Sequence, residues 1–335
     1  MENVTTLLAQ IAPQRSTQYA ELASALAPHE LALSPLGPHI AGLEPVRLGG
    51  QDYLRVALRG APDERLTEEL GALATVSAWF AYHKEVGGEP GPWLRPVETG
   101  YLPFLPPDLV TARRYRGKTN ELFTHFMCNV ARHASAFAPQ PWGELRLMDP
   151  LAGGGTTLLV GLMLGADVAG VEKSPQDVQS TATFLQGYAR EKRIPCQVRE
   201  ERLRGFGRRW WLTVGRDPQR QCILAQGETV QAEELLRGVR PAHLLVADLP
   251  YGIQHRGPLV ALLGEALPVW TGLLLPGGAL ALAWDATRFP RAEMLDVVGQ
   301  EARLEVLNEP PYDALAHRVD RVIRRRDVVV ARRRE

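Results

Sequence analysis

The chain has 335 residues and a mass of 37.0 kDa, which fits two domains or one large domain with an attachment. Lys plus Arg and Asp plus Glu balance at 38 each, which excludes a globally basic nucleic-acid coat protein but allows a local basic face. The three cysteines lie far apart, so we expect no disulfide framework, no cysteine zinc site, and a reducing, cytoplasmic location. No uncharged apolar run reaches ~18 residues and the first residues lack a signal-peptide pattern, so no membrane association is expected.

The first 95 residues predict a small α+β domain whose role stays open, with RNA binding as one candidate. A helical pattern runs over Thr6–Leu26, and a second helix is expected over Asp63–Leu73, capped near its first residue. Thr75–Tyr82 is rich in β-branched and aromatic residues and predicts a strand. The proline-rich stretch Glu89–Pro107 can continue neither a helix nor a central strand, so it predicts an extended linker, with residues 96–112 joining two domains.

Residues 113–335 alternate between strand-like runs and helix-length segments. Strands are expected at Leu145–Met148, Val168–Val171, Cys222–Ala225, His243–Ala247 and Ala279–Trp284, with two further candidates at Arg303–Leu307 and Asp327–Ala331. Helices are expected at Gly155–Leu164, Pro175–Arg190 and Leu259–Leu275. This alternation predicts an α/β fold with a doubly wound parallel sheet and helices on both faces.

A glycine-rich turn joins the first of these strands to its helix, in the segment LMDPLAGGGTTLLVG. Gly153, Gly154 and Gly155 allow a tight turn and a close approach of a ligand to the backbone, and the helix start offers free N–H groups. Glu172 follows at the end of the second strand, where an acidic residue would bind ribose hydroxyls. The alternative is a glycine turn that only lets the helix pack on the strand.

This turn does not match a dinucleotide-binding fingerprint, because Leu158 stands where the third glycine is required. Its DPxxGxGTT form instead resembles the first motif of class I methyltransferases that use S-adenosylmethionine. The resemblance implies a Rossmann-like methyltransferase fold, with S-adenosylmethionine as the cofactor. The cofactor-binding residues that it implies in this segment and the next strand are Asp149, Pro150, Ala152, Gly153, Gly155, Thr156, Thr157, Glu172 and Lys173.

A second motif, Asp248-Leu249-Pro250-Tyr251-Gly252, directly follows the predicted strand His243–Ala247. It lies where open α/β sheets bind ligands, and it resembles the (D/N)PPY motif of methyltransferases that act on exocyclic base nitrogens. An exocyclic amine is planar and a poor nucleophile. The Asp248 carboxylate and the Leu249 carbonyl could accept its two N–H groups and aim its lone pair, while Pro250 fixes the backbone and Tyr251 stacks on the extruded base. The alternative is a strand-to-loop turn with a buried tyrosine.

Two further segments resemble cofactor-binding regions. Lys118, Thr119 and Asn120 precede the fold proper and could bind the cofactor carboxylate, although Thr119 or Asn120 could equally cap a helix. Glu228 follows the third strand, where the family has an acidic residue near the adenine amino group, although a solvated loop glutamate fits nearly as well.

Two arginine-rich stretches are candidates for nucleic-acid contact. Arg199–Arg220 interleaves seven arginines with Phe206, Trp210 and Trp211, and Trp210–Val214 is expected to form a hairpin with Cys222–Ala225. The alternative is a solvated hairpin with its tryptophans in the core. The basic run Arg318–Arg334 could contact phosphates or guard an exposed edge strand.

The combination of motifs resembles the tRNA guanosine-N2 methyltransferase group whose members often carry a THUMP domain, although residues 1–95 lack a clear THUMP pattern. The resemblance covers roughly residues 113–332. It implies transfer of a methyl group to an exocyclic amine of a nucleobase, most directly guanine N2 in tRNA, with no metal required. The alternatives are a DNA N6-adenine or N4-cytosine methyltransferase, a non-catalytic RNA-binding protein and a small-molecule methyltransferase. The presence of both Asp248 and Tyr251 argues against a non-catalytic protein.

Overall fold

A computed structural model describes residues 4–14, 19–115, 117–250, 256–319 and 324–335. The chain divides into two compact units. The small unit comprises residues 1–102 and 310–325, and the large unit comprises residues 103–309 and 326–335. The division after Leu102 falls within the predicted linker. The sequence pattern did not predict that residues 310–325 belong to the small unit.

The small unit contains an antiparallel sheet of strand order β2-β3-β1-β4-β5. Its strands are β1 (Val4–Ile11), β2 (Ile40–Leu48), β3 (Gln51–Arg59), β4 (Val76–Val86) and β5 (Glu89–Pro96), and its helices are α1 (Leu22–Leu33), α2 (Glu64–Gly71) and the 3-10 helices Gly37–His39 and Tyr312–Ala314. Its core gathers Leu31, Val56 and Trp79. The α2 prediction is confirmed, because the Asp63 carboxylate accepts a bond from Leu66 N at 2.8 Å.

Two predictions in this unit are wrong for reasons that lie in the sheet. The helix expected over Thr6–Leu26 is the central strand β1 followed by α1, because a strand between two neighbours has an apolar run without clear alternation. The first half of the proline-rich stretch is not a linker but strand β5, which pairs only with β4. An edge strand tolerates proline because its outer N–H groups need no partner.

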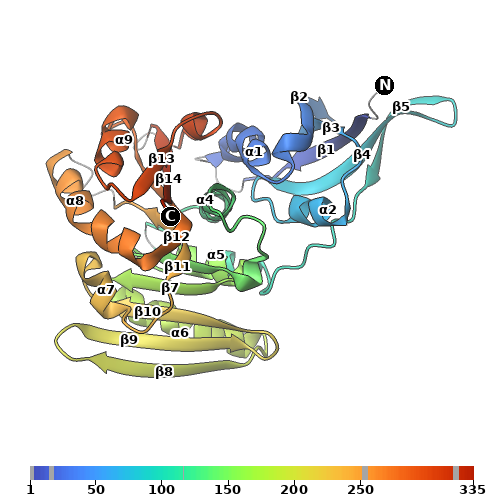
Figure 1. Ribbon diagram of the computed structural model, residues 1–335. Helices are drawn as coiled ribbons and strands as arrows, with labels where there is room; N and C mark the ends of the chain where they lie inside the picture. The colour runs from blue at the N-terminus through green and yellow to red at the C-terminus, as the bar shows by residue number, and fades with distance from the viewer. Residues whose placement is uncertain (1–3, 15–18, 116, 251–255, 320–323) are drawn as a thin grey trace. The chain divides into compact units, whose positions relative to one another are not determined.

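The large unit confirms the predicted doubly wound α/β fold (Figure 1). Its sheet has the order β13-β14-β12-β11-β6-β7-β10-β9-β8, and the run from β12 to β10 is parallel throughout. The strands are β6 (Arg146–Asp149), β7 (Asp167–Glu172), β8 (Cys196–Leu203), β9 (Gly207–Gly215), β10 (Gln219–Gln226), β11 (Ala242–Asp248), β12 (Leu274–Asp285), β13 (Leu304–Leu307) and β14 (Arg326–Arg333).

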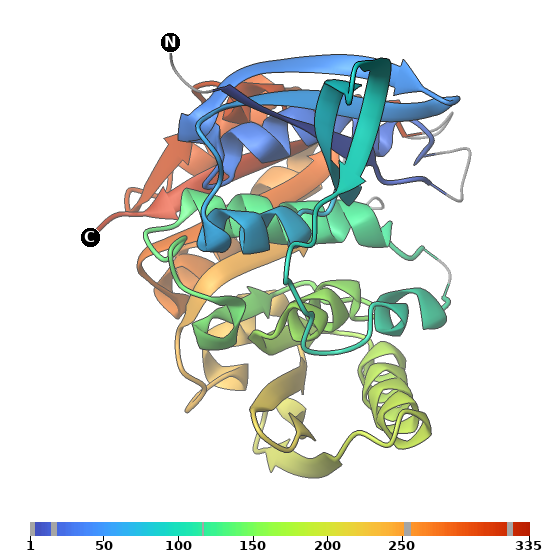
Figure 2. The same cartoon turned by 90° about the vertical axis from the view of Figure 1, so that its right-hand side faces the viewer.

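Helices cover both faces of this sheet. The helices are α3 (Asp108–Ala112), α4 (Glu121–Ala134), α5 (Thr156–Leu164), α6 (Pro175–Glu191), α7 (Ala232–Leu235), α8 (Arg256–Leu273) and α9 (Arg291–Gly299), with 3-10 turns at Trp142–Glu144 and Thr229–Gln231. On one face α5 packs so closely on Gly170 that a Cβ there would lie 2.7 Å from Leu158 Cδ1. On the other face Val171 joins a core with Leu235 and Leu263, from α7 and α8. Figure 2 shows α3 beside α6, where Asp108 accepts bonds from Tyr188 and Lys192 at 2.5 Å each.

The predicted pairing of Trp210–Val214 with Cys222–Ala225 is confirmed, as β9 pairs antiparallel with β10. The hairpin β8–β9 extends the sheet beyond β10. Trp210 is buried, and the Arg209 guanidinium donates to Leu235 O at 3.0 Å, Arg237 O at 2.9 Å and the Glu201 carboxylate at 2.9 Å. Trp211 packs against the core of the large unit and donates to Glu201 of β8 at 3.0 Å. Two of the three aromatic residues and Arg209 therefore hold the hairpin to the fold.

The interpretation of the C-terminal arginines as guards of an exposed edge strand is wrong. Strand β14 lies between β12 and β13, so it is an internal strand. Arg326 is buried, Arg332 donates to Ala134 O at 2.6 Å, and Arg333 donates to Leu274 O. These three side chains bind within the large unit, and Arg321 lies outside the described residues.

Candidate cofactor and substrate site

A cavity of about 500 Å³ opens at the carboxyl ends of β6, β7, β10 and β11. This is the edge at which open α/β sheets bind ligands. Most of the residues predicted to bind cofactor or substrate line it: Thr119, Asp149, Pro150, Ala152, Gly153, Thr156, Thr157, Glu172, Lys173, Glu228, Asp248, Leu249 and Pro250. The predicted loop between β6 and α5 and the predicted motif after β11 thus meet in one cavity.

The glycine loop (Gly153–Gly155) needs glycine for its backbone conformation and for its close contacts with neighbouring side chains. Gly153 and Gly155 adopt positive φ angles of 49° and 86°, a region that side chains disfavour. A Cβ on Gly155 would lie 2.6 Å from Thr181 Cγ2, so Gly155 itself supports the loop from behind rather than lining the cavity. A Cβ on Gly154 would lie 2.3 Å from Tyr115 Cζ.

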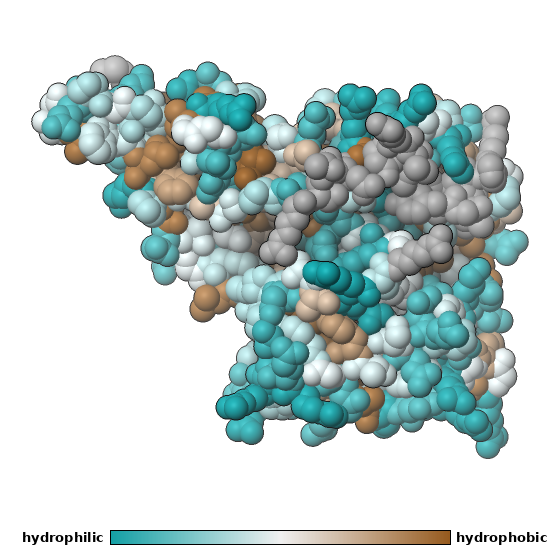
Figure 3. Space-filling view, turned by 180° about the vertical axis from the view of Figure 1, so that it is seen from behind, coloured by the Kyte–Doolittle hydropathy of each residue, from teal (hydrophilic) through white to brown (hydrophobic). Residues whose placement is uncertain are grey.

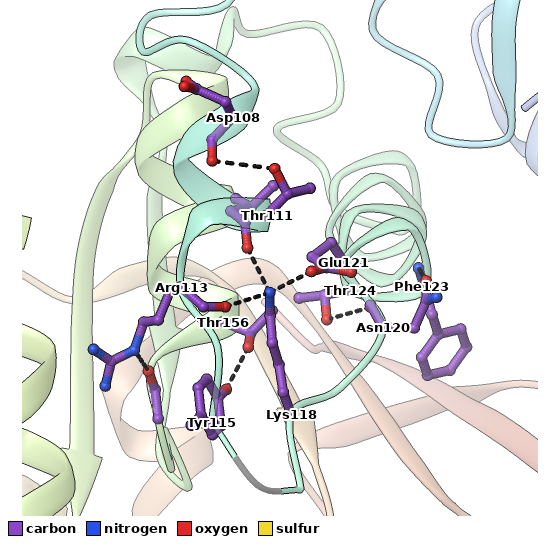
Figure 4. A network of polar contacts seen from close by, with 12 residues as sticks. Asp108, Thr111, Arg113, Tyr115, Lys118, Asn120, Glu121, Phe123, Thr124 and Thr156 are labelled. Carbon is purple, nitrogen blue, oxygen red and sulfur yellow. Dashed lines mark hydrogen bonds and ion pairs between the residues drawn. The ribbon is translucent and has the colours of Figure 1, made fainter. Parts of the chain in front are cut away.

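Two residues that the sequence reasoning missed hold this loop in place, as Figure 4 shows. The Arg113 guanidinium is buried and donates to Gly154 O at 2.7 Å and to Thr181 Oγ1 at 2.9 Å. The Tyr115 hydroxyl lies 2.5 Å from Thr156 Oγ1, at the start of α5. A segment that precedes the sheet in the chain therefore closes over the loop, a contact that no local sequence pattern signals.

Glu172 closes the loop from the neighbouring strand. Its Oε2 accepts a bond from Gly153 N at 2.9 Å, and its Oε1 accepts one from Ser174 N at 2.8 Å. The Glu172 carbonyl also accepts a bond from Gly227 N at 3.0 Å, which ties the end of β7 to the end of β10. The carboxylate is half-buried and lines the cavity, so it remains within reach of a ligand.

Asp149 is a buried carboxyl group on the floor of the cavity, and burial raises its pKa to about 7. Hydrogen bonds from the Thr157 side chain and from Leu151 N, the latter at 2.9 Å, act in the opposite direction, and the nearby Asp248 and Glu172 raise the pKa further. A positive charge beside Asp149 would stabilise the ionised form of this carboxyl group, which burial disfavours.

Asp248 is held from two sides. Its Oδ2 accepts a bond from the Thr119 hydroxyl at 2.6 Å, and its Oδ1 forms an ion pair with Arg326. Arg326 comes from β14, is buried, and stacks its guanidinium 4.6 Å above the Phe123 ring. A carboxylate has about four acceptor positions, so two remain for a ligand. The backbone after it is also anchored, because Leu249 N donates to Ala283 O at 2.9 Å.

Arg326 is the third site residue that sequence reasoning missed. Its place in an arginine-rich run favoured a phosphate contact, and only the insertion of β14 beside β12 brings it to Asp248. Tyr251 and Gly252 lie outside the described residues.

Lys118 and Asn120 do not line the cavity. Lys118 Nζ donates to Val110 O at 2.6 Å and Arg113 O at 2.8 Å and pairs with Glu121, at the centre of the network in Figure 4. Asn120 caps α4, accepting a bond from Phe123 N at 3.0 Å. Both residues shape the segment that carries Thr119 and Tyr115.

The described residues contain no cluster of three or more His, Cys, Asp or Glu side chains arranged to hold a metal ion. Among the helices of the same residues, none is long and apolar enough to cross a membrane.

No family model and no curated protein matches the chain. Solved structures of similar fold include TrmN from Thermus thermophilus, at 12% identity over 98% of this chain and 99% of that chain, with a TM-score of 0.49. They also include the T. thermophilus 16S rRNA N2 G1207 methyltransferase RsmC with AdoMet and guanosine, at 14% identity over 100% and 66%, TM-score 0.37. The rRNA methyltransferase AviRa from Streptomyces viridochromogenes is 15% identical over 67% and 89%, TM-score 0.41.

Proposed function

We propose that the large unit is an S-adenosylmethionine-dependent methyltransferase that modifies an exocyclic amine of a nucleobase in RNA, with guanine N2 of tRNA as the preferred target. The observation that carries this proposal is the convergence of the glycine loop, Glu172 and Asp248 on one cavity. A general nucleotide-binding fold would account for the glycine loop and Glu172. It would not account for Asp248 and the Leu249 carbonyl in the same cavity.

The residues present fit the cofactor. The glycine loop removes side chains where a ligand would approach, and Glu172 offers a carboxylate for ribose hydroxyls. The buried Asp149 suits a ligand that carries positive charge, because its carboxyl group lacks a cationic partner among the contacts that shift its pKa. Glu228 lies two residues beyond the end of β10 and lines the same cavity, where its carboxylate would accept a bond from an adenine amino group.

The substrate amine would be bound by Asp248 and the Leu249 carbonyl. The Asp248 carboxylate and the carbonyl accept one N–H each, which favours a pyramidal nitrogen and directs its lone pair into the cavity. When bound, the cofactor supplies an electrophilic methyl group on a sulfonium. Thr119 and Arg326 keep the carboxylate from rotating, so its remaining acceptor positions point in fixed directions.

The test is transfer of labelled methyl from S-adenosylmethionine to two substrates: tRNA from cells that lack this gene and unmethylated genomic DNA. Label recovered as N2-methylguanosine from tRNA supports the proposal, whereas label in DNA alone would replace it with a DNA methyltransferase.

Asp248→Ala should abolish this transfer while cofactor affinity changes little, since Asp248 acts on the substrate. Glu233→Ala, at an exposed position of α7, is the matched control and should leave turnover unchanged. Equal turnover in the two variants would remove Asp248 from the mechanism.

A further inference from the structure

The turn between β8 and β9 carries arginines that the fold does not use. Arg202 and Arg204 are exposed, and neither side chain forms a hydrogen bond or an ion pair with any residue that the structure describes. Phe206 lies between them and Arg208 with 39% of its surface exposed. We call Arg202, Arg204, Phe206 and Arg208 the arginine turn. It differs from the neighbouring Arg209, whose guanidinium is fully engaged within the large unit.

The arginine turn works against folding stability. Arg202 and Arg208 are direct cross-strand partners, and like charges in that position repel each other. Glu200 forms an ion pair with Arg208 at 3.1 Å, which offsets part of this repulsion and leaves Arg202 without a counter-charge. An exposed aromatic side chain among unneutralised arginines is a combination that suits an RNA strand, through phosphates and base stacking.

The arginine turn lies at the same edge of the sheet as the cavity. Arg208 pairs with Gln226, the last residue of β10, and the next two residues, Gly227 and Glu228, line the cavity. Asp248 ends β11, which is separated from β9 by β6, β7 and β10. Four strand spacings of about 4.8 Å place the turn roughly 20 Å from Asp248. The lower end of the large unit, where Figure 1 places β8 and β9, is mostly hydrophilic on the face seen in Figure 3.

We propose that the arginine turn is a second RNA contact, which binds backbone phosphates about 20 Å from the nucleotide at Asp248 while Phe206 stacks on an unpaired base. The inference rests on the proposed function for its partner, an RNA large enough to reach both places. The small unit, residues 1–102 and 310–325, holds 14 acidic and 11 basic side chains, so it offers little net attraction to a polyanion. Phosphate contacts on the large unit would add to the attraction.

The test is the salt dependence of binding between the full chain and an unmodified tRNA transcript. In the variant Arg202→Thr/Arg204→Ser, the slope of log affinity against log salt should fall by about 1.5 to 2, because two phosphate contacts are lost. Affinity at about 0.1 M salt should fall at least about tenfold. The matched control is Arg190→Ser/Arg216→Thr, which removes two exposed arginines at the opposite edge of the sheet and should leave the slope unchanged.

An unchanged slope in the first variant, or an equal loss in the control, would overturn the proposal. Phe206→Ser should weaken binding without changing the slope, because stacking releases no counterions, and unchanged affinity there would remove Phe206 from the contact. The thermal midpoint of Arg202→Thr/Arg204→Ser should not fall, since the repulsion with Arg208 is relieved, so weaker binding cannot be assigned to misfolding.

The binding assay also separates this inference from the proposed function. Binding requires no methyl transfer, so a changed slope without methylation of any RNA would support the contact and refute the activity. Methylation of tRNA with an unchanged slope would support the activity and refute the contact. An oligonucleotide of about four stacked nucleotides spans only about 10 Å, at about 3.4 Å per nucleotide, and cannot reach from Asp248 to the arginine turn, so wild type and variant should turn over equally.

Discussion

Replacing Arg326 by methionine should be among the most disruptive single changes in the large unit. The Arg326 side chain is 1% exposed and pairs with Asp248, whose side chain is 17% exposed. Removing one partner of a buried ion pair costs about 3–5 kcal/mol, and the partial exposure of Asp248 places this case near the lower limit. Methionine keeps the apolar stem but loses the contact with the Phe123 ring, worth about 1–2 kcal/mol. We therefore expect the free energy of unfolding to fall by about 4 kcal/mol.

The assay is a double-mutant cycle by urea unfolding, with Arg326→Met, Asp248→Asn and both together. In the double variant no uncompensated charge remains, so the loss should be smaller than the sum of the single losses by about 1–3 kcal/mol. Arg326→Lys keeps the charge and should recover part of the stability. Additive losses, within about 0.5 kcal/mol, would show that the two side chains do not depend on each other and would refute the reasoning.

Two further predictions concern the cavity floor and the glycine loop. Gly155→Ala should lower the free energy of unfolding by about 1–3 kcal/mol, because φ is 86° and the new Cβ meets Thr181. The control Gly187→Ala in α6, where a Cβ meets nothing within 4 Å, should raise it by about 0.5–1 kcal/mol. Equal thermal midpoints for the two variants would contradict this account. Asp149 has a pKa of about 7 in the folded chain against an ordinary value of 3.8, so its contribution to stability is fully present below pH 3.8 and is lost as pH rises through 7. The free energy of unfolding should fall by about 4 kcal/mol over this pH range in wild type and should not fall in Asp149→Asn. Chemical unfolding at a series of pH values measures this, and a wild-type free energy that changes no more with pH than that of the variant would contradict the prediction.

The large unit was predictable because its signals are local. Glycine at the β6–α5 turn, an acid at the end of β7 and the motif after β11 each follow a strand at a fixed distance, and a parallel sheet brings such positions to one edge. The pairing of β9 with β10 could be predicted for the same reason, from the turn residues between the two strands, whereas β8 was not predicted.

The parts that sequence reasoning missed depend on contacts between distant segments. Arg113 reaches Ser180 and Thr181 across the start of α6, and Arg326 reaches Asp248 through the order of the strands. Strand β1 was taken for a helix because its apolar residues are buried by neighbours on both sides, which erases the alternation of an exposed strand. Charge was equally ambiguous, since Arg209 and Arg326 are buried anchors whereas Arg202 faces solvent.

The insertion of β14 between β12 and β13 also sets the order in which the site can form during synthesis. Asp248 leaves the ribosome 78 residues before Arg326, an interval on the order of ten seconds at typical elongation rates. During that interval the cavity edge can assemble around the glycine loop, but the carboxylate lacks the partner that orients it. Catalytic geometry is therefore a property of the nearly completed sheet, and a nascent chain with β6 to β12 in place could bind ligand before it could act on it.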